Sequence, residues 1–123
     1  MFDLLIKRVY EKPDKNDGYR ILIDRLWPRG ISKEDALIDD WFKDISPSTE
    51  TRKSFDHQPD KMEEFRKIYF EELERNLESP EFLDLIFTRL KKDKVTLLYG
   101  AKDEKNNNAI VLKEWIEKKR KGK

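Results

Sequence analysis

The chain has 123 residues, of which 37% are hydrophobic and 43% are charged, and its formal net charge is +1. This length predicts one domain, residues 1–123, and the aromatic residues that recur in its periodic segments exclude a disordered chain. A net charge so close to zero argues against nucleic acid as a partner. The absence of cysteine excludes disulfides, thiolate nucleophiles and cysteine-bound metals.

Neither end of the chain indicates a membrane. The first ten residues are too short and too soon charged to form a signal peptide, and no apolar run approaches the roughly 20 residues that span a bilayer. We therefore expect a cytoplasmic protein with no membrane partner. The lysine-rich end, residues 117–123, is expected to be a solvated tail, with a weak anionic partner as the alternative.

Two strands are predicted near the amino terminus. Leu4–Tyr10 is rich in apolar and β-branched residues, and Arg20–Leu26 has apolar residues on both of its faces, as a covered central strand would. The polar connection, residues 11–18, ends in the turn pair Asp17-Gly18. Because this connection is short, it favours a hairpin between the two strands.

The segment after the second strand leaves the sheet. Pro28 cannot donate to a strand ladder, and Gly30 permits a backbone angle that other residues avoid. Ser32 resembles the cap of a short helical turn, with Asp35 as its weaker partner. The segment Ala36–Phe42 is ambiguous, because its apolar residues would also share one helical face.

Three longer helices are predicted in the second half. One covers about Thr49–Phe55. The clearest is Asp60–Leu77, where apolar residues recur at steps of three and four and Asp60 is the expected cap. Another begins at the Ser79-Pro80 pair, since proline is tolerated at a first helical position.

The end of the chain completes an α/β pattern. Val95–Tyr99 is a continuous apolar run, typical of a strand buried on both faces, and a last helix is expected from Ala109 to about Lys119. Helices separate the second and third strands, so those two are expected to be parallel. The predicted fold is a small sheet of about three strands covered by helices, in a Rossmann-like layering.

Polar residues gather in the two loops that leave the carboxyl ends of the central strands. If these strands are parallel neighbours, the two loops meet at one edge of the sheet, where α/β proteins bind ligands. Arginine forks and a lysine near a helix start suit a phosphate or carboxylate group. We therefore expect a small anionic ligand, and the candidate binding residues are Arg25, Trp27, Arg29, Tyr99, Lys102 and Asn107.

Three residues are candidates for catalysis if the ligand is also turned over. Asp24 or Asp103 could act as a base, while His57 lies at a helix end, where interaction with the helix dipole is the simpler explanation. A purely structural role is the more common interpretation, because Asp–Arg pairs often lock loops and asparagines often cap helices. We expect no metal and no cofactor, since there is one histidine, no cysteine and no phosphate-loop or dinucleotide glycine pattern.

Three segments carry a family resemblance: DGYRILIDRLWPRGISKEDA, WFKDISPSTETRKSF and VTLLYGAKDEKNNNAIVL. They resemble the YeaO-like branch of domain-of-unknown-function family 488, from about Ile6 to Ile116. That family has no established activity, so the resemblance implies a fold and a candidate surface. Its longer members resemble an α/β layout with parallel first strands joined by a helix, which favours a mostly parallel sheet here. His57 matches a histidine that is usual in this branch, whereas Asn106 stands where the branch usually has a second histidine. This difference weakens any proposal for a site that needs two histidines.

Two functions from different classes remain open. The first is a domain that binds a small anionic ligand at these loops, with or without turnover. The alternative is a non-catalytic module for protein or nucleic acid, which would use the acidic outer face of the helix predicted at Asp60–Leu77 and the basic tail, residues 117–123. The sequence leaves the ligand's identity and the oligomeric state open.

Overall fold

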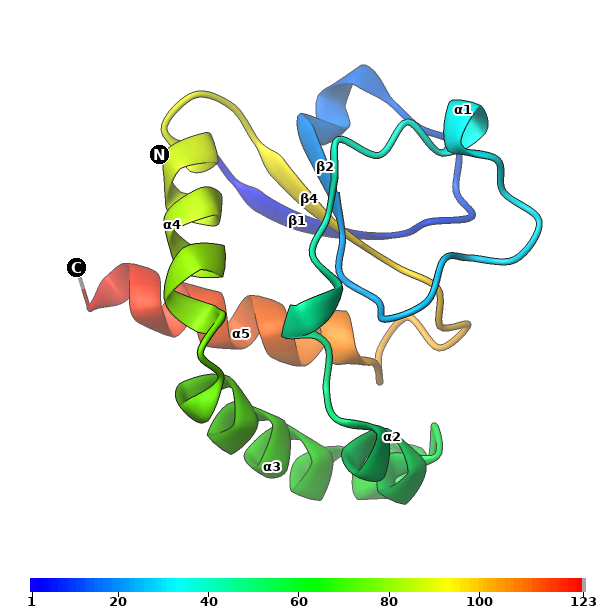
Figure 1. Cartoon of the computed structure of the whole chain (residues 1–123), viewed down its shortest axis with the longest axis vertical. Coiled ribbons are helices and arrows are strands. Elements are labelled where there is room, and N and C mark those ends of the chain that lie inside the picture. Colours follow the sequence, from blue (N-terminus) through cyan, green and yellow to red (C-terminus); the bar gives the residue numbers. More distant parts are fainter. Residues whose placement is uncertain (123) are drawn as a thin grey trace.

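The computed structural model describes residues 1–122 and contains a four-stranded, all-parallel sheet (Figure 1). Across the sheet the strand order is β1 (Leu4–Arg8), β4 (Val95–Tyr99), β2 (Tyr19–Leu22) and β3 (Asp40–Trp41). Every residue of β4 is buried, because its uninterrupted apolar run can be covered on both faces. The predicted α/β fold with a mostly parallel sheet is confirmed, and β3 is a fourth strand that the sequence did not predict.

The first two strands are not neighbours. Both pair with β4, which lies between them, so that Val95 faces Leu4 on one side and Tyr19 on the other. The hairpin favoured by the short connection is therefore wrong. The connection contains only a 3-10 turn at Lys15–Asp17, not an α-helix. It enters β2 through Gly18, whose φ of +67° lets the chain pass close to Lys94.

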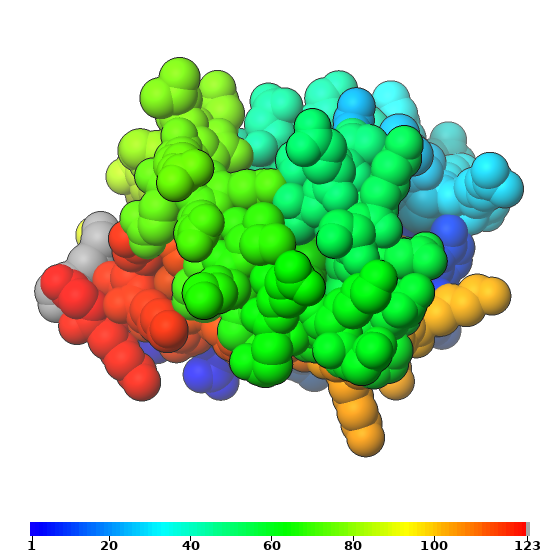
Figure 2. All heavy atoms as spheres, turned by 90° about the horizontal axis from the view of Figure 1, so that it is seen from below, coloured from blue at the N-terminus to red at the C-terminus, as the bar shows by residue number. Residues whose placement is uncertain are grey.

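One face of the sheet is covered by helices, and this side holds the main core. The helices are α2 (Thr49–Phe55), α3 (Met62–Arg75), α4 (Ser79–Leu90) and α5 (Asn108–Lys121). Their apolar sides pack on Ile21, Ile23 and Leu97 of the sheet region. Seen from below, α2 and α3 in green form most of the near surface, with the end of α5 in red beside them (Figure 2).

The other face of the sheet is covered mainly by the long loop between β2 and β3. Leu22 and Leu98 form a second, smaller cluster on this side, against Trp27 and Trp41. The two tryptophan rings meet edge to face with centroids 5.5 Å apart. The prediction that β2 is apolar on both faces is thus confirmed. The loop itself carries one short helix, α1 (Lys33–Ala36).

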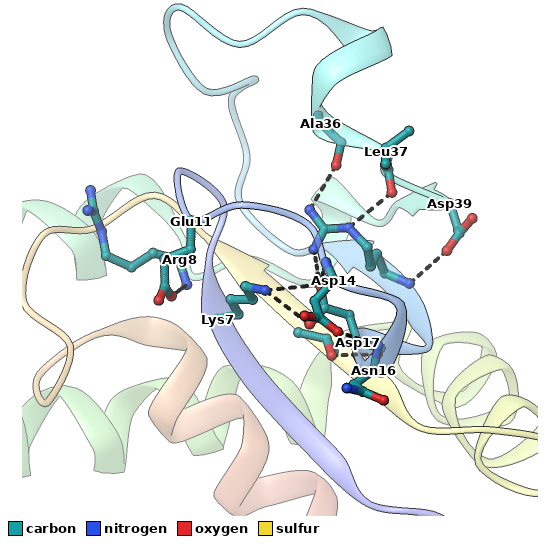
Figure 3. A network of polar contacts seen from close by, with 11 residues as sticks. Lys7, Arg8, Glu11, Asp14, Asn16, Asp17, Ala36, Leu37 and Asp39 are labelled. Atoms are coloured by element: carbon teal, nitrogen blue, oxygen red, sulfur yellow. Dashed lines mark hydrogen bonds and ion pairs between the residues drawn. The ribbon is translucent and has the colours of Figure 1, made fainter.

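A buried ionic network holds this covering loop to the sheet (Figure 3). Arg20, which is 4% exposed, pairs with Asp17 at 2.5 Å, and Lys7 reaches the same carboxylate at 3.1 Å. Arg20 also donates to the carbonyl oxygens of Leu37 at 3.0 Å and Ala36 at 2.8 Å. Burial alone would raise the pKa of Asp17, but the hydrogen bonds from the Asp14 amide, Lys7 and Arg20 outweigh it and lower that pKa.

The predicted bounds agree with the structure for α2 but not for α3. α2 has the predicted bounds, with the Ser48 side chain capping its first turn. The helix predicted at Asp60–Leu77 begins instead with a 3-10 turn, Pro59–Lys61, so Asp60 does not cap it. It ends at Arg75, and Leu77 is 92% exposed rather than part of the apolar face.

Two other segments differ from expectation. The ambiguous segment 36–42 is not helical, because Leu37 has a φ of +48° and β3 follows it. Residues 117–121 of the expected basic tail continue α5, where Arg120 pairs with Glu117 at 3.1 Å, and Lys123 lies outside the described residues. Within residues 1–122, no helix combines the length and the apolar composition needed to cross a membrane.

Candidate functional site

A cavity of about 520 Å³ lies at the carboxyl edge of the sheet. It is bordered by the loop after β2, the loop after β4, the segment before α2 and the end of α2 itself. Its polar lining comprises Asp24, Arg25, Arg29, Ser46, Arg52, His57, Asn107 and Asn108, and its remaining lining comprises Leu26, Pro47, Phe55, Phe65, Gly100 and Ala101. The two loops meet here because β2 and β4 are parallel neighbours. The sequence predicted that these strands are parallel, and the structure shows that they are also adjacent.

Asp24 joins the two loops at this edge. Its Oδ2 accepts a hydrogen bond from the amide of Gly100 at 2.8 Å, and its Oδ1 accepts one from Nδ2 of Asn108 at 3.1 Å. Gly100 follows β4 directly and Asn108 begins α5. A side chain at residue 100 would place its Cβ 3.2 Å from Oδ2, so the glycine allows the close approach.

The environment of Asp24 raises the pKa of its carboxyl group. Burial is the main cause, because it disfavours the ionised form. The hydrogen bonds from Asn108 and Gly100 oppose this shift, as do the charges of Arg52 and His57, without cancelling it. Asp24 is therefore an acid that takes up a proton more readily than an exposed aspartate.

Arginine side chains dominate the charge of the cavity. Arg25 and Arg29 extend from the loop after β2, and Arg52 extends from α2. Arg25 and Arg52 both donate to the hydroxyl of Thr49, Arg52 through Nη2 at 3.3 Å. Within the described part of the chain, the buried Nε of Arg52 has no hydrogen-bond partner.

The orientation of α2 is set by Glu72 of α3. Its carboxylate accepts bonds from the amide of Ser48 at 2.9 Å, from the Ser48 hydroxyl at 2.7 Å and from the Thr51 hydroxyl. A carboxylate is favourable at a helix start, where free N–H groups point outward. Arg52, one residue beyond Thr51, is thereby positioned from a neighbouring helix.

His57 reaches the cavity because α2 ends in an unusual turn. Asp56 and His57 both have positive φ, at 46° and 53°, in the left-handed region. This turn brings the imidazole to 6.1 Å from the Phe55 ring, between ring centroids. Phe55 in turn stacks on Phe65 at 4.3 Å and forms part of the apolar wall of the cavity.

Five of the nine candidate residues from the sequence line this cavity: Asp24, Arg25, Arg29, His57 and Asn107. Asn107 also has a structural role, because its Oδ1 caps α5 by accepting the amide of Ile110 at 2.9 Å. Arg25, Arg29 and His57 are exposed, whereas Asn107 is buried.

The other four candidates lie elsewhere: Trp27, Tyr99, Lys102 and Asp103. Trp27 packs on Trp41 and donates to the carbonyl of Ile31 at 2.7 Å. Tyr99 belongs to the main core, and Lys102 is exposed. Asp103 holds its own loop, since it accepts hydrogen bonds from the amides of Lys105 and Asn106, and these bonds lower its pKa.

Sequence reasoning missed Arg52, Asn108 and the apolar wall. The helix that carries Arg52 was predicted with the right bounds, but nothing in its local pattern places it beside the end of β2. Asn108 belongs to a run of asparagines, residues 106–108, which the sequence indicates as a helix cap and not as part of a site. Within residues 1–122, no three histidine or acidic residues gather as a metal site would require.

Comparisons with known proteins give the chain relatives but no activity. Residues 3–123 match the family described as the inactive DUF488-N3 subclade. The chain is 46% identical over 111 residues to the uncharacterized protein YeaO of Escherichia coli (strain K12), which covers 89% of this chain and 93% of that protein. Uncharacterized proteins of Mycobacterium tuberculosis and Mycobacterium bovis are 48% identical over 68 residues, 55% of this chain and 58% of theirs. No solved structure is significantly similar.

Proposed function

The chain belongs to the inactive DUF488-N3 subclade, and from that premise we propose that it binds a small anionic ligand in the cavity without converting it. The charge of the cavity carries this proposal. Among the described residues that line it, three arginines and a histidine stand against the single carboxylate of Asp24. An anion is the ligand that compensates such an excess of positive charge.

The chemistry of the cations supports a phosphate or a carboxylate. A guanidinium group presents its N–H donors in a planar fork that matches both anions. Arg25, Arg29 and Arg52 all line the cavity, and Arg25 and Arg29 lie at exposed positions, so these guanidinium groups are available to an anion that enters it. His57 supplies a further donor in the same lining.

The hydrogen bonds of Asp24, the candidate catalytic residue in the cavity, are consistent with binding without turnover. Asp24, the group best placed to act as a base, has a structural role, because its hydrogen bonds with Gly100 and Asn108 join the two loops. The description of the subclade as inactive points the same way.

The alternative, an interaction module for protein or nucleic acid, has weaker support. Its expected surfaces are the acidic helix, observed as α3, and the basic end of the chain, in α5, and ion pairs connect α3 with α5. Arg66 of α3 contacts Glu114 of α5 at 2.7 Å, and Lys119 of α5 contacts Glu74 of α3 at 2.7 Å. Charges compensated within the molecule attract a charged partner less strongly.

A binding titration with a panel of phosphate and carboxylate compounds tests the proposal. The double variant Arg25→Ala/Arg29→Ala removes two exposed cations from the cavity, and Lys102→Ala/Lys105→Ala removes two exposed cations outside it. We expect the first to weaken binding at least about tenfold, the cost of one or two charge-assisted hydrogen bonds. The second should leave affinity unchanged. No binding of any anion, or equal losses in both variants, would refute the proposal.

A further inference from the structure

We infer that Asp24 makes this cavity selective for anions that carry a hydrogen-bond donor, namely a phosphate monoester that retains one proton, over donor-free anions such as a sulfate ester. This inference rests on the proposed function and names the ligand class of the same site. It assigns to Asp24 a role in specificity, not in catalysis.

The hydrogen bonds of Asp24 leave it able to accept more. Each carboxylate oxygen accepts one bond, Oδ2 from Gly100 and Oδ1 from Asn108. A carboxylate has about four lone-pair positions, so about two remain. Asp24 also lines the cavity, beside the arginines. An ionised carboxylate can only accept, so a ligand group placed against it must donate.

Phosphate and sulfate esters differ in this one respect. A phosphate monoester has its second pKa near about 6, and below that value it carries one negative charge and one P–OH donor. A sulfate monoester has the same tetrahedral shape and the same charge but no proton. In the cavity, the P–OH group would donate to Asp24 while the ionised oxygens accept from the arginines. The sulfate would instead set an oxygen lone pair against the carboxylate, which repels it.

The surroundings of Asp24 further favour a ligand that donates a proton in a hydrogen bond to its carboxylate. Burial raises the pKa of Asp24, so the ionised form is already disfavoured before a ligand enters. Three charged or titratable groups interact electrostatically with Asp24: Arg52 of α2, His57 just after α2, and Tyr69 of α3. A ligand with its own P–OH group can donate a hydrogen bond to the carboxylate of Asp24 without placing a second unpaired negative charge beside it.

The apolar wall suggests matched probes. Phe55 and Phe65 stack on each other, and Pro47 lies on the same lining. A small aromatic body can pack on such a wall. Phenyl phosphate and phenyl sulfate present the same ring and nearly the same head group. They differ in that singly charged phenyl phosphate carries a P–OH proton and phenyl sulfate carries none.

The experiment is a calorimetric titration of both probes at about pH 6, near the second pKa of the phosphate. We expect the wild type to bind phenyl phosphate at least about tenfold more tightly than phenyl sulfate, because a site built around a donor rejects its donor-free analogue. In Asp24→Asn this ratio should fall toward one, chiefly through tighter sulfate binding. Asp103→Asn, which removes an aspartate outside the cavity, should keep the wild-type ratio.

A second measurement does not depend on the folding of an Asp24 variant. Phenyl sulfate keeps its charge between about pH 8 and about pH 4, so its affinity for the wild type should rise as the pH falls and Asp24 gains a proton. The same series in His57→Asn removes the imidazole side chain from the cavity lining. Asparagine tolerates the positive φ of residue 57.

The outcomes separate the two proposals. Equal binding of both probes by the wild type, or a sulfate affinity in His57→Asn that does not change with pH, overturns the selectivity and leaves anion binding intact. An unchanged ratio in a folded Asp24→Asn variant removes Asp24 from the selectivity. Failure of every anion in the panel to bind overturns the proposed function itself.

Discussion

Oδ2 of Asp24 accepts a hydrogen bond from the backbone amide of Gly100, with an N···O distance of 2.8 Å, although the two residues are 76 positions apart in the chain. The bond ties the end of β2 to the end of β4 and, through Asn108, to the start of α5. It also satisfies an amide that would otherwise face the cavity without a partner. Asp24 therefore has a structural role beside the role in ligand selection that we propose.

The raised pKa of Asp24 predicts a stability change with pH. Its folded pKa lies above the unfolded value of about 3.9. Its contribution to stability is therefore fully present below the unfolded pKa and is lost as the pH rises through the folded pKa. Asp24→Asn should accordingly be least destabilising, or stabilising, near neutral pH and more destabilising in acid. Urea unfolding at about pH 7 and about pH 4 checks this sign.

Asp17 should behave in the opposite way. Its hydrogen bonds to Asp14, Lys7 and Arg20 lower its folded pKa below the unfolded value. The stability it contributes is present above the unfolded pKa and is lost as the pH falls through the folded pKa. Asp17→Asn leaves Arg20 buried without its counter-ion, so we expect a loss of about 3 kcal/mol near neutral pH.

The same urea experiment separates this loss from a general effect of removing an acid. Asp60→Asn changes an exposed aspartate away from the network and should cost little. A loss for Asp17→Asn that grows in acid would contradict the stated direction of its pKa shift.

Gly18 and Gly30 form a natural pair for testing a close backbone contact. Both have positive φ, at 67° and 78°, so alanine is strained at either position. At Gly18 the new Cβ would also lie 2.1 Å from the carbonyl oxygen of Lys94, whereas at Gly30 nothing lies within 4 Å. We expect Gly30→Ala to cost about 1 kcal/mol and Gly18→Ala more than about 3 kcal/mol, because the Lys94 backbone must move.

Chemical unfolding of both alanine variants measures this difference. Equal losses would show that backbone angle alone matters, and that the connection between β1 and β2 does not depend on its contact with Lys94.

Glu72 should matter more than its neighbour Glu71. Glu72→Ala removes the carboxylate that accepts from Ser48 and Thr51 at the start of α2, and we expect a loss of about 2 kcal/mol. Glu71→Ala, on an exposed position of the same helix, should lie within about 0.5 kcal/mol of wild type. Thermal unfolding of the two variants tests the ranking.

Glu72→Ala has a second expected effect, on ligand binding. Arg52 lies on α2, so a looser α2 should weaken anion binding at temperatures where the variant is still folded. Affinity equal to wild type in a destabilised Glu72→Ala variant would show that Glu72 does not position Arg52.

Elements whose signals lie within one segment can be predicted from the amino-acid sequence. The apolar run of β4 predicts its burial on both faces, and the apolar residues of β2 predict a strand covered on two sides. Ser48 marks the start of α2 because a capping hydroxyl acts within one helical turn. The parallel relation of β2 and β4 followed from the helices between them, whereas the meeting of their two loops also required the two strands to be neighbours.

Contacts between residues that are distant in the chain depend on how the separate elements pack. The strand order, with β4 between β1 and β2, depends on a connection that passes close to Lys94 through Gly18. The network of Lys7, Asp17 and Arg20 and the place of Arg52 beside Asp24 depend on packing between separate elements. Periodicity and capping report the neighbours of a residue along its own segment. Contacts such as Asp24 with Gly100 arise when the whole chain minimises its exposed apolar surface, and no local pattern contains them.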